Sequence, residues 1–374
     1  MSGRLVVWWQ LTAVSLLAVL VVALHLSVGL PATDHSPSSD IVSVPHASTS
    51  SDAIEQIQAE YMYDRVWFTG DVMLSRQVGQ FAEERGADYP WRRVESLFGA
   101  RDAVVINFEA CLSNRAAFDW NNSMKFPVAP ALLPAIVQSG ITHASLANNH
   151  SFDCGIDDFA FTKSQLASAG VSPFGHPLAV TDLSVSTTTV GNYTVGIVAL
   201  HTLYENPDYD ELSAVISRLK AATDYQVAYI HWGVEYELSS HESQQVLAQQ
   251  LASHGIDLIV GHHPHVVQEI AQFGDTVVFY SLGNFIFDQY FSPEVQEGLV
   301  VVLEPVTGLQ ARLVPVSSVS ARTQPAPLHG EEREQFLQLL AARSDPTLQT
   351  AIINATIPLA YDLATSTKPR IIAP

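Results

Sequence analysis

Three histidines stand within four positions of this chain, at His262, His263 and His265. They follow the apolar run 256–260 and Gly261, a pattern typical of a buried strand that presents imidazoles just beyond its end. Imidazole nitrogens bind metals or carry protons, so the cluster predicts a metal or proton-transfer site at a strand end. Affinity tags and exposed turns also contain clustered histidines, but the same pattern of apolar run and polar cluster recurs at five other places.

The other clusters are rich in oxygen and nitrogen donors. They lie at 70–76, 107–109, 147–153, 231–236 and 281–285. Asp71 directly follows Gly70 and could project from a strand end or act as a helix N-cap. Alternation along a strand places Asn107 and Glu109 on one face. Mixed carboxylate, amide and imidazole donors suit Mn, Fe or Zn better than Ca or Mg, so we expect one or two such divalent ions.

Short apolar or β-branched runs alternate with segments of helical periodicity. Strands are predicted at 65–69, 103–107, 143–147, 193–200, 226–231, 257–260, 276–281 and 299–303, and helices at 76–85, 91–98, 131–138, 157–169, 209–222 and 242–254. This alternation predicts an α/β domain with largely parallel strands. Open α/β sheets bind ligands at the carboxyl ends of their strands, where the polar clusters lie.

The composition limits the classes of partner. The chain has 374 residues, 47% of them hydrophobic, which is enough to bury a sizeable core. It carries 38 acidic and 18 basic residues, a formal net charge of −20. Such a surface repels phosphate backbones, so no nucleic-acid partner is expected. An anionic ligand would need a metal or a few placed cations.

The N-terminal segment predicts a membrane anchor. Residues 5–30 form an apolar run, with Arg4 before it and Asp34 and Asp40 after it. The run is near the ~20 residues that span a bilayer, and the charge order keeps the N-terminus in the cytoplasm and the rest outside. We therefore expect a single-pass signal-anchor at 1–30 in the cell membrane; the alternative is cleavage after Gly29. A flexible Ser/Thr/Pro-rich stalk at 31–53, a globular domain at 54–318 and a C-terminal helix and tail at 319–374 would follow.

The order of the clusters resembles a known family. The motifs are 70–76 (GDVMLSR), 107–109 (NFE), 148–150 (NNH) with Asp153 and Gly155, 231–233 (HWG) with Glu235 and Tyr236, 263–265 (HPH) with Gln268, and 281–285 (SLGNF). Together, from about residue 66 to residue 303, they resemble the CapA (PgsA-type) family of poly-γ-glutamate capsule biosynthesis proteins. That family is similar in fold to the calcineurin-like metallophosphoesterases.

The resemblance implies a four-layer α/β/β/α sandwich with a metal site at its strand ends. The implied metal ligands are Asp71, Glu109, Asn149, His231, His263 and His265. His150 matches the imidazole that protonates the leaving group, and Arg76 would be an oxyanion partner. The residues expected to contact substrate are Arg76, Asn148, Glu235 and Asn284.

One position departs from the phosphoesterase pattern. Met73 stands where a histidine is usual, and a thioether is a poor ligand for these metals, so one metal position lacks a donor. Two functions remain open: a metal-dependent hydrolase or transferase outside the cell, or a non-catalytic, metal-stapled component of a polyglutamate synthesis or export complex. The expected partners are poly-γ-glutamate or a phosphoester, and other capsule-synthesis membrane proteins. A third hypothesis makes the clusters structural and the domain a binding module.

The two cysteines lie just beyond predicted strand ends. Cys111 follows Glu109 by two positions and Cys154 follows His150 by four. If those two strands are neighbours, the cysteines could approach closely enough for a bridge, which the compartment outside the membrane permits. The alternative is two separate buried thiols.

Overall fold

The computed structural model describes residues 62–114 and 124–359. The chain divides between Ser48 and Thr49, and all described residues belong to the second unit. The predicted anchor at 1–30 and stalk at 31–53 lie outside the described residues. Within the described ranges, no helix combines the length and the apolar character needed to cross a bilayer.

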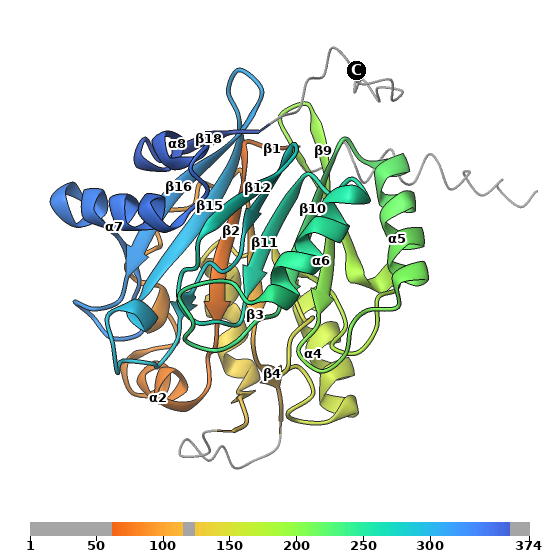
Figure 1. The fold of residues 1–374 in the computed structure, drawn as a ribbon. Helices are drawn as coiled ribbons and strands as arrows, with labels where there is room; N and C mark the ends of the chain where they lie inside the picture. Colours follow the sequence, from red (N-terminus) through yellow and green to blue (C-terminus); the bar gives the residue numbers. More distant parts are fainter. Residues whose placement is uncertain (1–61, 115–123, 360–374) are drawn as a thin grey trace, which may run out of the picture. The chain divides into compact units, whose positions relative to one another are not determined.

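One sheet has seven strands in the order β1-β8-β9-β10-β11-β13-β12 (Figure 1). They are β1 (Met62–Tyr63), β8 (Val185–Val190), β9 (Tyr193–His201), β10 (Tyr225–His231), β11 (Leu258–His262), β12 (Ile270–Phe273) and β13 (Thr276–Phe279). The central strands β9, β10, β11 and β13 are parallel. Antiparallel pairs occur nearer the edges, at β8–β9 and β12–β13. The carboxyl ends of β9, β10 and β11 therefore meet at one edge.

The second sheet has nine strands, ordered β17-β16-β15-β2-β3-β6-β7, with β14 paired to β2 and β18 to β16. They are β2 (Arg65–Val72), β3 (Asp102–Phe108), β6 (His143–Ser145), β7 (Ser172–Phe174), β14 (Asn284–Ile286), β15 (Glu297–Pro305), β16 (Leu309–Ser317), β17 (Ala326–Pro327) and β18 (Thr356–Pro358). Strands β2, β3, β6, β7 and β14 are parallel, whereas β15 is antiparallel to both of its neighbours, β2 and β16. A separate pair joins β4 (Cys111–Leu112) to β5 (Pro127–Val128).

Alternation along the strands builds the layers. In β9, Ile197 and Ala199 face the core between the two sheets, whereas Val198 and Leu200 pack against helices. The helices on that outer face are α5 (Tyr209–Ala222) and α6 (Glu242–Ser253). Those on the outer face of the nine-stranded sheet are α2 (Arg76–Arg85), α3 (Leu133–Gln138) and α4 (Ile156–Ser168). The described residues thus form a mixed α/β fold with helices, sheet, sheet and helices in succession (Figure 1).

Several strands, such as β8 and β16, lie outside the predicted ranges, and two further differences concern 91–98 and the C-terminus. The predicted helix at 91–98 is wrong: a 3-10 helix, η1 (Tyr89–Trp91), is followed by turns with hydrogen bonds from Val94 N to Trp91 O and from Leu97 N to Val94 O. The physical reason is that the backbone here pairs i to i+3, from Trp91 N to Asp88 O onward, and Pro90 in the first turn has no N–H to donate. The second difference is at the C-terminus, where β17 and β18 join the nine-stranded sheet.

The predicted C-terminal helix is present as α7 (Gly330–Arg343), followed by α8 (Gln349–Ile353). Phe336, Leu337 and Leu340 of α7 pack into the same apolar core as the facing sides of the two sheets. The segment after residue 318 therefore shares the core of the domain, as far as Leu359, the last residue described.

Candidate metal centre

The candidate ligands converge at the carboxyl ends of strands from both sheets. Asp71 lies in β2 and Glu109 directly follows β3, while His231 ends β10. His263 and His265 follow β11, and Asn149 and His150 lie in the turn beyond β6. Each sheet therefore supplies part of one site.

The first ligand group consists of Asp71, Glu109 and His231, whose ligand atoms all lie within 4.8 Å of one another. All three side chains are buried. The Asn107 amide nitrogen lies 2.8 Å from Asp71 Oδ1 and 3.0 Å from His231 Nδ1, so one side chain holds two candidate ligands in place. Asn149 Oδ1 is buried without a hydrogen-bond partner among the described residues, as expected for an amide oxygen that faces an ion.

The second ligand group consists of Glu235, His263 and His265, again within 4.8 Å of one another. His265 Nδ1 donates to Asn284 Oδ1 at 3.0 Å. This bond fixes the tautomer and leaves the Nε2 lone pair available to an ion. His265 Nε2 lies 3.8 Å from Glu109 Oε1, so the two groups adjoin.

The backbone is held in uncommon conformations around the second group. Tyr236, His263 and His265 have φ values of 66°, 97° and 58°, in the left-handed region that L side chains avoid. The turn at His263 lets its backbone N–H donate to Asp71 Oδ2 at 3.2 Å. Strain of this kind persists only where the surrounding structure over-determines it, and it concentrates at functional sites.

A close backbone approach positions β14 beside β2. At Gly70, a Cβ atom would lie 2.0 Å from Gly283 O, so no larger residue fits without a shift. The Asp71 N–H donates to Gly283 O at 3.0 Å. This contact brings Asn284 within reach of His265.

The electrostatics of the site fit a cation. Burial raises the pKa of Glu109 well above its ordinary value, and the negative charges of Asp71 and Glu235 add to the shift. Neither Glu109 carboxylate oxygen has a hydrogen-bond partner in the described part of the chain. Burial lowers the pKa of His231 well below its ordinary value and that of His263 to about 3, so both imidazoles are neutral, as ligands must be. These residues therefore fit a divalent ion.

Asp71 differs from Glu109 in its surroundings. Burial acts to raise the pKa of Asp71, but the hydrogen bond with His265, the charges of His262 and His265 and the Asn107 amide together bring it below its ordinary value. Asp71 is therefore ionised at neutral pH and ready to bind a cation.

His150 is held beside the ligands by its own set of contacts. Its Nδ1 donates to Asp153 Oδ2 at 2.7 Å, and its ring stacks on Phe126 with centroids 3.7 Å apart. Its Nε2 lies 3.7 Å from Glu109 Oε1. The guanidinium of Arg76 lies 4.5 Å from the centre of the same Phe126 ring and forms an ion pair with Asp288.

Three predicted substrate contacts have other partners. Asn148 donates to Asn107 Oδ1 and Phe108 O and accepts from His150 N, so it holds the loop that carries His150. Asn284 orients His265, while its Nδ2 donates to Val295 O. Both asparagine side chains are buried and hold neighbouring residues in place, and their contact with substrate stays a prediction. Glu235 belongs to the second ligand group.

Cys111 and Cys154 form a disulfide, with Cα atoms 6.1 Å apart. Strands β3 and β6, which precede the two cysteines, are parallel neighbours. The bridge thus ties the segment after Glu109 to the turn that carries His150.

We expect reduction of this bridge to lower the free energy of unfolding by about 2 to 4 kcal/mol, because reduction frees the closed loop in the unfolded chain. The measurement is denaturant unfolding of the protein with and without reductant. A chain with both cysteines replaced by serine is the control and should show no response to reductant. Two free thiols in the denatured, unreduced protein would contradict the assignment.

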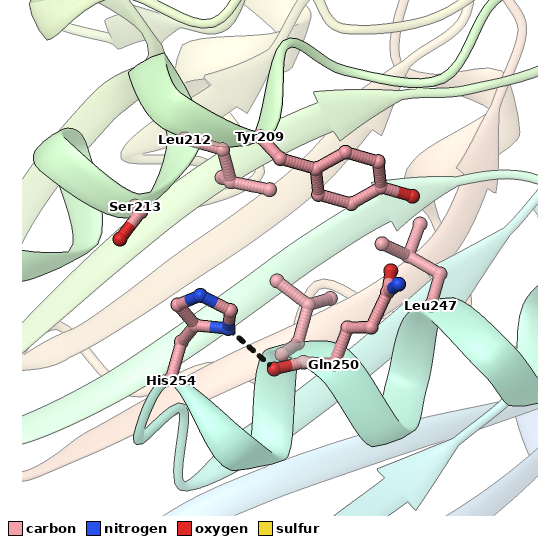
Figure 2. A pocket seen from close by; sticks show the side chains of 7 residues that line it. Tyr209, Leu212, Ser213, Leu247, Gln250 and His254 are labelled. Atoms are coloured by element: carbon pink, nitrogen blue, oxygen red, sulfur yellow. Dashed lines mark hydrogen bonds between the residues drawn. The ribbon is translucent and has the colours of Figure 1, made fainter.

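A hollow between α5 and α6 lies away from this site (Figure 2). Its residues Leu212, Leu247 and Leu251 lie on these helices, in the apolar cluster that covers the outer face of the seven-stranded sheet. It contains one imidazole, His254, whose Nδ1 donates to Gln250 O at 2.7 Å (Figure 2). The hollow therefore adds nothing to the metal centre.

Comparison with known proteins identifies the family. Residues 65–289 match the model of the family described as bacterial capsule synthesis protein PGA_cap. The chain belongs to the PGA_cap family. The matched range contains both ligand groups and His150.

Two curated relatives carry matching names. The chain is 30% identical over 249 residues to "PGA biosynthesis protein CapA" of Bacillus subtilis, covering 62% of this chain and 66% of that protein. It is 29% identical over 252 residues to "Capsule biosynthesis protein CapA" of Bacillus anthracis, covering 62% and 61%. The match thus spans less than two thirds of the length of these PGA_cap relatives. Among solved structures, a hypothetical protein from Thermus thermophilus has a TM-score of 0.42 at 15% identity, covering 71% of this chain and 98% of that one.

Several site residues inside the PGA_cap match were not found from sequence. Asp153 stands in a sequence motif that assigns it no role, and Phe126 and Asp288 carry no local signal because their partners are distant in sequence. His201 ends β9 in register with His231 of β10. Its Nδ1 donates to Pro177 O at 2.7 Å, and its position at the end of a predicted strand was the signal that could have found it.

Replacing His265 by alanine should weaken metal binding by at least about 10-fold, whereas His262→Ala should lower stability without that loss. His262 Nε2 donates to Thr69 O at 3.0 Å and its ring lies 4.1 Å from that of Tyr229, so it joins the two sheets. Titration of each metal-free variant with Mn²⁺ tests this. Equal loss of affinity in both variants would show that the ligand pair has been assigned to the wrong histidines.

Proposed function

We propose that this chain is a metal-dependent hydrolase or transferase of capsule biosynthesis that acts on poly-γ-glutamate or on a phosphoester. The observation that carries the proposal is the placement of His150. Its Nδ1 is bound to Asp153 at 2.7 Å while its Nε2 points to the ligand carboxylate of Glu109 at 3.7 Å. A metal that only staples the fold needs no oriented imidazole beside it, so this arrangement favours chemistry.

The side chains of this protein have separate tasks in the proposed reaction. A divalent ion bound to the two ligand groups would supply a Lewis acid and activate water. His150 gives its Nε2 proton to the leaving group, which is the amine nitrogen of a cleaved polyglutamate amide or the oxygen of a cleaved phosphoester, and the Asp153 carboxylate fixes the orientation of the ring. Phe126 stacks on the imidazole and limits its rotation. Arg76, close to the same ring, places positive charge near an anionic substrate.

The test is metal-dependent turnover by the full chain. Protein loaded with Mn²⁺ should shorten poly-γ-glutamate or hydrolyse a p-nitrophenyl phosphodiester. A transferase would instead pass the glutamyl or phosphoryl group of the same substrate to an acceptor alcohol. Removal of the metal with chelator should abolish the reaction, and Mn²⁺ should restore it. If neither substrate reacts at any metal loading although the ions bind, the proposal fails and a non-catalytic, metal-stapled role in a polyglutamate synthesis or export complex takes its place.

We further propose that the described domain lies outside the cytoplasm, anchored in the cell membrane by residues 1–30, near other capsule-synthesis membrane proteins. The support is the apolar run 5–30 preceded by Arg4. Protease added to intact, wall-stripped cells should remove the domain and leave a membrane fragment. A protected domain, or a mature chain that starts near Leu30 and is free in the medium, would refute the anchored topology.

A further inference from the structure

Position 73 contributes no metal ligand. Met73 is fully buried in the apolar cluster on the helix-covered side of the nine-stranded sheet. Its Sδ accepts a hydrogen bond from Ser75 N at 3.0 Å. A thioether is in any case a poor ligand for hard or borderline metals. An ion at the second position must therefore take its ligands from elsewhere in the chain.

Glu235 brings a carboxylate to that second position. Its ligand atom lies within 4.8 Å of those of His263 and His265. His263 is 7% exposed, and its Nδ1 is buried with no hydrogen-bond partner among the described residues. An unpartnered buried imidazole nitrogen beside a carboxylate is the arrangement that a metal completes.

The second group also adjoins the first. His265 Nδ1 lies 3.3 Å from Asp71 Oδ2, and its Nε2 lies 3.8 Å from Glu109 Oε1. Glu109 has both oxygens buried and without hydrogen-bond partners in the described ranges, so it can face an ion on either side. Neighbouring ions that share ligands are the geometry of two-metal sites, where the separation is about 3.5 to 4 Å.

The loop that carries Glu235 is fixed by hydrogen bonds that follow directly after this residue. Tyr236 N donates to Pro264 O at 2.8 Å, directly between the two histidines of the second group. Gln268 Nε2 donates to Glu237 O at 2.8 Å and Ser240 N donates to Glu269 at 3.0 Å. An exposed glutamate is ordinarily a solvated side chain. Here its backbone is tied to the segment that contains His263 and His265, so its carboxylate stays beside them.

We propose that Glu235 is a metal ligand that replaces the histidine absent at position 73, so that a second divalent ion binds to the second ligand group. This inference rests on the metal-dependent function proposed above. One carboxylate and two imidazoles suit Mn, Fe or Zn and leave coordination positions for water or a substrate oxygen.

The test is the number of Mn²⁺ ions bound by the full chain. The metal-free protein is titrated calorimetrically with Mn²⁺ alone, and bound manganese is counted by elemental analysis. Wild type should bind two ions. Glu235→Gln should keep one and bind the second at least about 10-fold more weakly. Glu237→Gln is the matched control, since its exposed side chain lies on the same loop outside both groups, and it should bind two ions like wild type.

The outcomes separate this inference from the proposed function. Glu235→Gln protein that binds two ions with unchanged affinity would overturn the ligand assignment alone, as would wild-type protein that binds one ion. Wild-type protein that binds no Mn²⁺, Zn²⁺ or Fe²⁺ would contradict both the ligand assignment and the proposed metal-dependent function. Thermal unfolding of the metal-free variants checks that they fold. A second readout is electron paramagnetic resonance, which should show exchange coupling between two Mn²⁺ ions in wild type and no coupling in Glu235→Gln.

Discussion

Replacement of His150 by alanine should lower turnover by about 10²- to 10⁴-fold and leave the bound metal unchanged. The imidazole is positioned to donate a proton, because Asp153 binds its Nδ1 and Phe126 supports its ring. It belongs to neither ligand group. Removal of the ring therefore removes the proton donor but none of the ligand atoms.

Two variants sharpen this experiment. Asp153→Asn keeps the imidazole but replaces the carboxylate that binds its Nδ1, so the ring is held less firmly and turnover should fall, but less than in His150→Ala. His254→Ala removes an imidazole from the hollow between α5 and α6 and should turn over like wild type. Loss of metal in His150→Ala would make His150 a ligand and contradict its assignment as the acid.

Glu109→Gln should change metal binding and metal-free stability in opposite directions. Loss of the carboxylate should weaken metal binding by about 100-fold or more. Glu109 is assigned as a direct ligand, and even the loss of a group that only supports a ligand costs about 10- to 100-fold. The metal-free protein should become more stable by about 1 to 3 kcal/mol at neutral pH, because it no longer buries an ionisable carboxyl group without hydrogen-bond partners. Denaturant unfolding in chelator, and Mn²⁺ titration of the same samples, measure the two effects.

The pH dependence of stability gives the sign of the change expected for metal-free Glu109→Gln. The pKa of Glu109 is raised in the folded chain by burial, above the ordinary value of 4.5. Metal-free wild type therefore loses stability as the pH rises above that value, until the folded pKa is passed. Glu109→Gln lacks this loss, so the two proteins should be similar at acid pH and diverge toward neutral pH. A variant less stable than wild type at neutral pH without metal would contradict the account.

The placement of the site followed from the sequence because of a property of parallel strands. Carboxyl ends of neighbouring strands meet at one edge, so the clusters after β2 and β3 meet in one sheet and those after β10 and β11 meet in the other. The packing of the two sheets then brings these two halves together. The resemblance of the ordered motifs then gave each residue an expected role, and Asp71, Glu109 and His231 do lie together.

Contacts between distant segments could not be predicted in the same way. Arg76 pairs with Asp288, 212 positions away, and no local pattern encodes that partner. Likewise, no pattern in the sequence indicated that Asn148 and Asn284 are buried and hydrogen-bonded to Asn107 and His265. At 91–98, helical periodicity favoured an α-helix, although Pro90 and turn hydrogen bonds decided otherwise.

The division of the ligands between the two sheets has a consequence for folding kinetics. Asp71 and Glu109 come from the nine-stranded sheet, and His231, His263 and His265 from the seven-stranded sheet. A complete site exists only after the sheets dock, so metal uptake is a late event in folding and an indicator that docking has finished. Interactions that form after the folding barrier slow unfolding and leave the folding rate unchanged. Bound ions would thus slow the unfolding of the domain, because the two sheets must separate before the ligands of one site can come apart.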